Sequence, residues 1–79
     1  MSEYRAAPRK RTLKTGTIEF GGGGIDCIVR NMSDTGAALS VESPVGIPSE
    51  FKLVIAADQV SRVCRVVWRK ENRIGIRFI

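Results

Sequence analysis

The chain has 79 residues, of which 43% are hydrophobic and 27% charged, and it contains no histidine. This length predicts a single domain with a modest core, because so short a chain buries only roughly 60% of the surface exposed on unfolding. The missing histidine removes the commonest metal ligand and general base, and two cysteines without a C-x-x-C motif exclude a disulfide scaffold. The net charge of +5 favours an anionic partner.

The first fourteen residues contain a single acid, Glu3, and five basic residues: Arg5, Arg9, Lys10, Arg11 and Lys14. A proline at position 8 and the lack of an apolar stripe argue against a helix here. We therefore interpret residues 1–11 as a flexible basic arm that carries an R-x-x-x-R pattern ahead of the first strand. From these residues alone, the arm is a solvated tail, a nucleic-acid patch or a clamp for a specific ligand.

Period-two alternation of apolar and polar side chains runs through most of the remaining sequence and predicts β-strands. In the first strand Ile18 and Phe20 share a face, Leu13 is out of phase, and we expect a bulge at Gly16 to restore the register. Five later segments each place apolar residues on one face: Ile25, Cys27 and Val29; Ala37, Leu39 and Val41; Phe51, Leu53, Ile55 and Ala57; Cys64, Val66 and Trp68; Ile74, Ile76 and Phe78.

Turn residues separate these segments. Four glycines at 21–24 predict a tight hairpin, and the SDTG segment at 33–36 predicts a polar turn. Two prolines exclude a central strand in the loop at 43–50, and ADQV and KENR predict two further hairpins. Six short antiparallel strands predict an all-β domain over residues 12–79, either a small barrel or a sandwich.

The hexapeptide NMSDTG follows the second strand and has the spacing N-x-S-x-x-G, with Asn31, Ser33 and Gly36 at the defined positions. Asn and Ser side chains bond either to nearby backbone or outward to a ligand, and glycine tolerates a positive φ. Taken alone, the hexapeptide is more simply a plain polar turn than a binding site.

Read together with Arg5-x-x-x-Arg9, this motif resembles the signature of the PilZ family, R-x-x-x-R followed by D/N-x-S-x-x-G. The likeness extends through IDCIVRNMSDTGAAL, RVVWR and the closing RIGIRF, and so covers almost the whole chain. The resemblance implies a six-stranded antiparallel Greek-key β-barrel. Many members carry a further C-terminal helix, which we expect to be absent here because the sequence stops at Ile79.

The resemblance also implies function, since PilZ domains are bacterial receptors for the second messenger cyclic di-GMP. It implies that Arg5 and Arg9 clamp the ligand, where guanidinium forks suit guanine edges and phosphate. It further implies that Asn31 and Ser33 bond to guanine or phosphate and that Gly36 lets the backbone approach the ligand. We expect the arm to fold over the ligand on binding, with no cofactor and no catalysis.

Four further residues are secondary candidates. Tyr4 stands where an arginine in family members goes with two stacked ligands, so the resemblance favours one bound molecule. The tyrosine ring either stacks on a guanine or is exposed to solvent at the N-terminus, and the two interpretations are equally favoured. Lys10 is either a phosphate contact or a solvated charge. Trp68 shares its predicted face with Cys64 and is more simply a residue of the core or its rim than a stacking platform. Arg69 follows it and is expected to face solvent near the site. Both cysteines are expected to be small buried hydrophobes.

Other functions remain open on the sequence. A small barrel that binds single-stranded nucleic acid would need exposed aromatics, but Phe20, Phe51 and Phe78 fit core faces and leave only Tyr4 and Trp68. A ligand-independent adaptor that binds another protein is a third interpretation. An enzyme is the least favoured, because histidine, paired carboxylates and a P-loop are missing. No apolar run spans a membrane and no secretory leader is visible, so we expect a cytoplasmic receptor with an unidentified downstream partner.

Overall fold

The structure is a computed structural model that describes residues 10–79. It contains six strands and one short 3₁₀ helix, η1: β1 (Lys10–Phe20), β2 (Gly23–Met32), β3 (Gly36–Ser40), β4 (Glu50–Ile55), η1 (Ala56–Asp58), β5 (Val60–Lys70) and β6 (Arg73–Phe78). The first strand begins inside the segment 1–11 that the sequence suggests is an arm, and residues 1–9 lie outside the described part.

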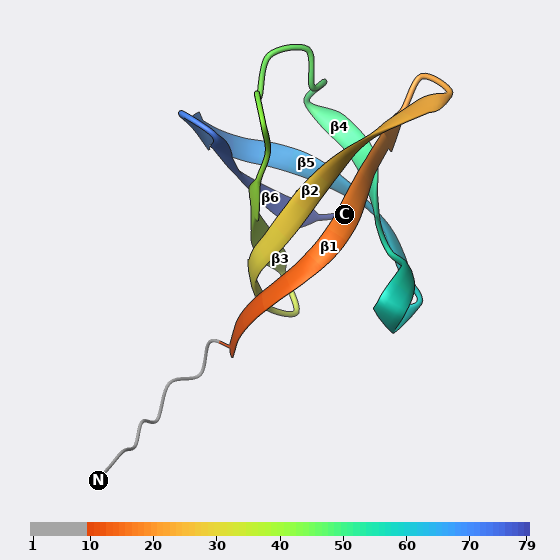
Figure 1. The fold of residues 1–79 in the computed structure, drawn as a ribbon, viewed down its shortest axis with the longest axis vertical. Helices are drawn as coiled ribbons and strands as arrows, with labels where there is room; N and C mark the ends of the chain where they lie inside the picture. Colours follow the sequence, from red (N-terminus) through yellow and green to blue (C-terminus); the bar gives the residue numbers. More distant parts are fainter. Residues whose placement is uncertain (1–9) are drawn as a thin grey trace, which may run out of the picture.

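All neighbouring strands are antiparallel and close into a barrel in the order β1-β2-β3-β6-β5-β4, with β4 returning to pair with β1. The first three strands follow one another, and the loop after β3 then carries the chain to β4 on the far side (Figure 1). This connection makes the order a Greek key, because β6 rather than β4 lies beside β3. The all-β barrel predicted from the sequence is confirmed.

The core fills the inside of the barrel and comes from the alternating apolar faces. Thirteen hydrophobic residues are buried, namely Ile18, Cys27, Val29, Leu39, Val41, Ile47, Phe51, Leu53, Ile55, Cys64, Ile74, Ile76 and Phe78. Most of the predicted inward positions are therefore confirmed. Ala57 is an exception, since β4 ends at Ile55 and Ala57 is exposed in η1.

The predicted hairpins are also confirmed, and one shows why its glycines are needed. Between β1 and β2, Gly21 and Gly22 have φ values of 56° and 81°. A type I′ turn requires positive φ at both central residues, and its twist matches that of the flanking strands. The turn after β5 is equally short and places Glu71 at a φ of 53°.

Three register shifts interrupt the ladders, and none of them is at Gly16. In β1 the shift lies between Arg11 and Lys14, whereas Gly16 pairs regularly with Cys27. The predicted bulge at Gly16 is therefore wrong. Gly16 instead faces the interior, where an added Cβ would lie 3.3 Å from Cys27 Sγ and from the Val54 carbonyl oxygen. Leu13, the residue that seemed out of phase, is 69% exposed next to the true shift.

Candidate functional site

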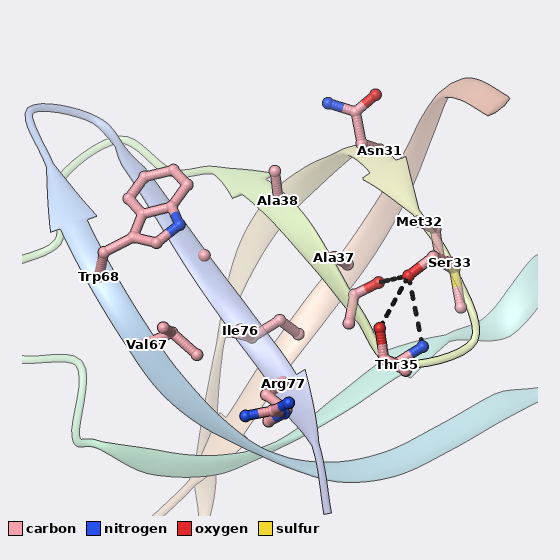
Figure 2. A pocket seen from close by; sticks show the side chains of 12 residues that line it. Asn31, Met32, Ser33, Thr35, Ala37, Ala38, Val67, Trp68, Ile76 and Arg77 are labelled. Atoms are coloured by element: carbon pink, nitrogen blue, oxygen red, sulfur yellow. Dashed lines mark hydrogen bonds between the residues drawn. The ribbon is translucent and has the colours of Figure 1, made fainter. Parts of the chain in front are cut away.

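An open pocket of about 590 Å³ lies on the outer surface of the barrel (Figure 2). It extends over the end of β2, the turn that follows, β3, β5 and β6. We call it the outer pocket, and it is lined by Asn31, Met32, Ser33, Thr35, Gly36, Ala37, Ala38, Val67, Trp68, Gly75, Ile76 and Arg77. Three of the main sequence-predicted site residues, Asn31, Ser33 and Gly36, are thus brought together with the secondary candidate Trp68.

Strand register explains why the surface is hollow here. Across four neighbouring strands Asn31 pairs with Ala38, Ala38 with Gly75, and Gly75 with Trp68. The two middle positions of this row carry a methyl group and a hydrogen, whereas the end positions carry an amide and an indole. Small residues in the centre and larger ones at the ends give the pocket its floor and two of its walls.

Two bulges turn the larger side chains outward. The register shifts between Val29 and Asn31 in the β2–β3 ladder and between Val66 and Trp68 in the β5–β6 ladder. Strict alternation would place both Asn31 and Trp68 inside the barrel, with Val29 and Val66. A bulge adds one residue and redirects the side chains that follow it. The prediction that Trp68 shares a face with Cys64 is therefore wrong: Trp68 is 45% exposed, whereas Cys64 is buried.

The indole of Trp68 packs directly over Gly75. A Cβ built on Gly75 would overlap Nε1 and Cε2 of the indole, so only glycine leaves room for this arrangement. The backbone beneath the ring is buried although it lies on the outside of the barrel. Trp68 therefore has one face supported by β6 while nearly half of its surface remains accessible.

The turn from Ser33 to Gly36 is held by local hydrogen bonds. The Ser33 amide donates to the Gly36 carbonyl at 2.8 Å, and the Thr35 amide donates to Ser33 Oγ at 3.3 Å. Ser33 Oγ also lies 3.2 Å from Thr35 Oγ1, so the two hydroxyls sit side by side at the pocket wall (Figure 2). The Phe78 amide donates to the Thr35 carbonyl at 2.8 Å, which ties the turn to β6.

Gly36 has a different reason for being glycine than the sequence suggests. The φ of Gly36 is not positive, so its backbone conformation does not require glycine. Instead, an added Cβ would overlap the Ile76 carbonyl of β6. Gly36 thus permits close approach of β3 to β6.

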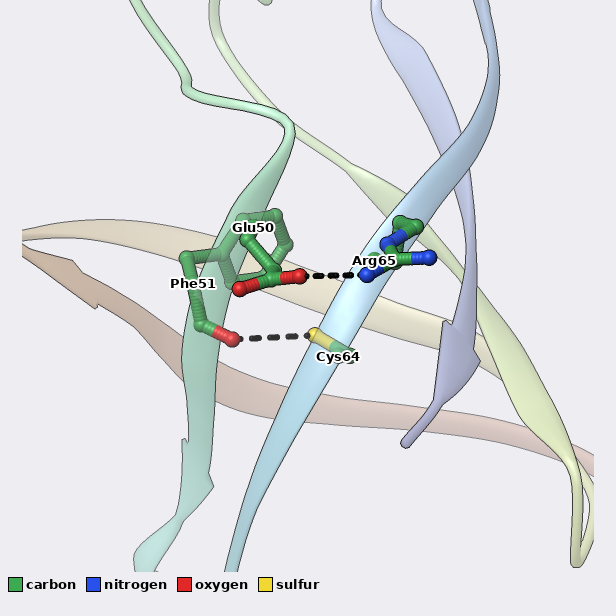
Figure 3. Close-up of polar contacts among 4 residues, drawn as sticks. All are labelled: Glu50, Phe51, Cys64 and Arg65. Atoms are coloured by element: carbon green, nitrogen blue, oxygen red, sulfur yellow. Dashed lines mark hydrogen bonds and ion pairs between the residues drawn. The ribbon is translucent and has the colours of Figure 1, made fainter.

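The positive charge of the outer pocket comes from Arg77, which is exposed on β6. Its cross-strand neighbour Arg65 is held by Glu50, with 2.7 Å between Arg65 Nη2 and Glu50 Oε2 (Figure 3). Arg77 was not singled out from the sequence, because in RIGIRFI it reads as one more solvent-facing position of a strand. Ala38 and Gly75 were missed for the same reason, and Thr35 because it occupies one of the unspecified positions of N-x-S-x-x-G.

The remaining predicted residues lie elsewhere or outside the described part. Arg69 does not line the outer pocket; its Nη1 donates to the Pro44 carbonyl at 3.2 Å in the loop after β3. The backbone at Lys10 pairs with Met32, and its side chain is not described. Tyr4, Arg5 and Arg9 lie outside the described residues.

The two cysteines are buried free thiols, as predicted. The Cys64 thiol donates to the Phe51 carbonyl at 3.5 Å on the inner side of β5 (Figure 3). Burial, and then the charge of Asp26, raises the pKa of Cys27 to about 11, although a hydrogen bond with the Gly16 backbone opposes the shift. Burial and the neighbouring Cys27 raise the pKa of Cys64 to about 12. Both thiols are thus protonated at neutral pH.

The family model for the PilZ domain matches residues 3–79. The chain belongs to the PilZ domain family. PilZ domains are binding domains rather than catalytic ones, and recognition of cyclic di-GMP is the role known for the family. No curated protein matches the chain. Among the described residues of this PilZ domain, no helix is long and apolar enough to cross a membrane.

Proposed function

We propose that this PilZ domain is a bacterial cyclic di-GMP receptor that binds the dinucleotide in the outer pocket and signals through a partner protein. The main support is the pair of bulges that turn Asn31 and Trp68 toward the same hollow. Bulges of this kind occur next to functional sites, where they re-aim side chains. Here the redirected amide and indole lie around a floor of small residues, together with two hydroxyls and a guanidinium.

The chemistry of the pocket suits a guanine nucleotide. The accessible face of Trp68 can stack on a base, an interaction worth about 1–3 kcal/mol per base. The Asn31 amide has both donors and an acceptor for a guanine edge, and the hydroxyls of Ser33 and Thr35 can donate to either base or phosphate. The Ser33 hydroxyl can continue to accept from the Thr35 amide while it donates its single proton to the ligand instead of to the Gly36 carbonyl, which lies 3.4 Å from Ser33 Oγ.

The start of β1 favours a contribution from the two signature arginines. Lys10 pairs with Met32 and Arg11 with Asn31, so the chain enters the barrel at the rim of the outer pocket. Arg9 is the residue just before this pairing, and Arg5 lies four residues earlier. We propose that both side chains bind the ligand from this end, where their planar guanidinium groups can bond bidentately to phosphate or to guanine O6 and N7.

Isothermal titration calorimetry with cyclic di-GMP tests this function. The wild-type chain should release or absorb heat on titration at micromolar protein, and Arg9→Ala should weaken binding at least about tenfold through loss of a charge-assisted contact. Lys52→Ala is a matched control, because it removes one exposed charge on β4 away from the outer pocket. Absence of wild-type binding would overturn the proposal, and equal binding by wild type and Arg9→Ala would overturn the role of Arg9.

Single-stranded oligonucleotides separate this function from general nucleic-acid binding. A protein that tracks a phosphate backbone gains affinity as the strand lengthens and loses it steeply with salt. The receptor proposed here should instead prefer cyclic di-GMP to any oligonucleotide, with no dependence on strand length. Affinity that rises from short to long oligonucleotides and exceeds that for cyclic di-GMP would favour the nucleic-acid interpretation.

A further inference from the structure

Arg77 has a defined place in the outer pocket that the predicted signature residues do not fill. It is the next outward-facing residue of β6 after Gly75, because Ile76 between them points into the core. Figure 2 shows Arg77 between Val67 on β5 and Thr35 in the turn after β2. Arg77 thus lines the same pocket as the hydroxyls of the turn, and Trp68 lines it from β5.

Backbone contacts on both sides of Arg77 fix its position relative to the turn. Gly36 pairs with Arg77 in the β3–β6 ladder, and the Phe78 amide donates to the Thr35 carbonyl at 2.8 Å. The lack of a side chain on Gly36 allows β3 to approach β6 closely at this point. Arg77 is thus held beside Thr35 by strand pairing rather than by the conformation of a loop.

The charge of Arg77 has no carboxylate partner within residues 13–79. The ion pairs found there are Lys14 with Asp58 and Arg65 with Glu50. Arg65 also faces Arg77 directly across the β5–β6 ladder, and like charges at opposed positions are destabilising. The ion pair with Glu50 offsets the charge of Arg65. The charge of Arg77 is not offset in this way and is available to an anion in the pocket.

We propose that Arg77 binds a phosphate oxygen of the ligand, as a preformed cation on the barrel that adds to the signature arginines. This inference rests on the proposed function. Gly75 and Arg77 are two residues apart on a strand, a separation of about 6.6 Å. A ligand whose guanine stacks on Trp68 above Gly75 then has Arg77 one outward position along β6 as a cation for its phosphodiester, in the pocket that Ser33 and Thr35 also line.

Calorimetry on two matched variants tests this role. Arg77→Gln and Arg73→Gln each remove one charge from an exposed position of β6, but only Arg77 lines the outer pocket. Arg77→Gln should weaken cyclic di-GMP binding about tenfold or more, and Arg73→Gln less than about twofold. The affinity of Arg77→Gln should also depend less on salt, because one screened attraction is gone. Equal thermal midpoints of the two variants would show that the barrel is intact.

Arg77→Lys distinguishes phosphate from a guanine edge as the group that Arg77 contacts. An ammonium still binds phosphate as a point charge but cannot reproduce a bidentate contact to a base. Arg77→Lys should therefore bind more tightly than Arg77→Gln. Equal weakness of these two variants would contradict the phosphate assignment. If the wild type binds cyclic di-GMP and Arg77→Gln binds it as tightly as Arg73→Gln does, this inference alone is overturned. If the wild type does not bind cyclic di-GMP, the proposed function and this inference are overturned together.

Discussion

At the scale of single residues, the contact between Trp68 and Gly75 connects packing to the proposed ligand site. Gly75→Ala should displace the indole, because the new Cβ overlaps the ring. We expect a loss of about 1–3 kcal/mol of stability, as for other overpacked sites, together with weaker cyclic di-GMP binding. Trp68 is the only tryptophan, so its emission reports the displacement directly. The spectrum of the folded variant should shift to longer wavelength as the indole becomes more exposed.

Gly23→Ala provides the control for this prediction. Gly23 also lies on a strand, but an added Cβ there meets no atom within 4 Å and its φ is not positive. Its replacement should be neutral or slightly stabilising, because alanine restricts the unfolded chain. If Gly75→Ala leaves both the emission spectrum and the affinity unchanged, the packing of Trp68 over Gly75 does not position the indole.

Gly36 belongs to the PilZ signature, yet its surroundings predict a structural role. Gly36→Ala should destabilise the barrel by about 2 kcal/mol or more, because the Cβ overlaps backbone of β6 that cannot move away as a side chain can. Urea unfolding followed by circular dichroism measures this change. A variant of unchanged stability that no longer binds cyclic di-GMP would show instead that Gly36 acts by admitting the ligand.

At the scale of elements, the hairpin between β1 and β2 can be improved. Gly21→Asn should stabilise the barrel by about 0.4–1 kcal/mol, because asparagine tolerates a positive φ and restricts the unfolded chain more than glycine. Gly22→Val at a φ of 81° should destabilise it by about 1–2 kcal/mol, since a β-branched residue resists that conformation. Equal unfolding midpoints for the two variants would contradict the turn assignment.

The strands and turns could be predicted because each depends on local chemistry. Alternation identified the inward faces of β2, β4 and β6, and glycine pairs and prolines marked the breaks between strands. The register shifts could not be predicted in the same way. A bulge depends on how one strand is aligned with its neighbour, and nothing in RVVWR distinguishes a regular strand from one that is bulged next to Trp68.

The candidate site shows the same division between local and nonlocal information. Asn31 and Ser33 were found through a contiguous motif, whose spacing is visible in the sequence. Arg77 and Gly75 join them only because β6 lies beside β3 in the barrel. That pairing crosses more than thirty residues of chain and follows from the Greek-key order rather than from any local pattern. Prediction from sequence therefore found Asn31 and the turn, named Trp68 only as a secondary candidate, and missed the floor of the outer pocket and its cation.

At the scale of the whole molecule, the closed barrel determines the reactivity of the two thiols. Cys27 and Cys64 are 3% and 0% exposed and line the interior. Their raised pKa values leave little thiolate at neutral pH, and the thiolate is the form that reacts. A disulfide reagent at pH 7 should therefore react with the folded protein only through opening of the barrel, and in proportion to the population of open molecules.

The same burial predicts how the stability of the barrel depends on pH. In the unfolded chain the Cys27 thiol has the ordinary pKa of 9.0, whereas burial in the barrel raises the pKa of Cys27 to about 11. The unfolded state therefore binds fewer protons above pH 9, and the free energy of unfolding falls as pH rises through this window, by at most about 1.4 kcal/mol per pH unit for each thiol. Below pH 8 this contribution is constant.

Urea unfolding of the wild type and of the double variant Cys27→Ala/Cys64→Ala between pH 7 and pH 10.5 isolates the contribution of the thiols. The double variant should be less stable at pH 7, since it leaves small cavities in the core. Its stability should nevertheless fall less between pH 9 and 10.5, because no buried thiol remains to ionise on unfolding. Parallel curves for the two proteins would mean that the buried thiols do not control how stability changes at high pH.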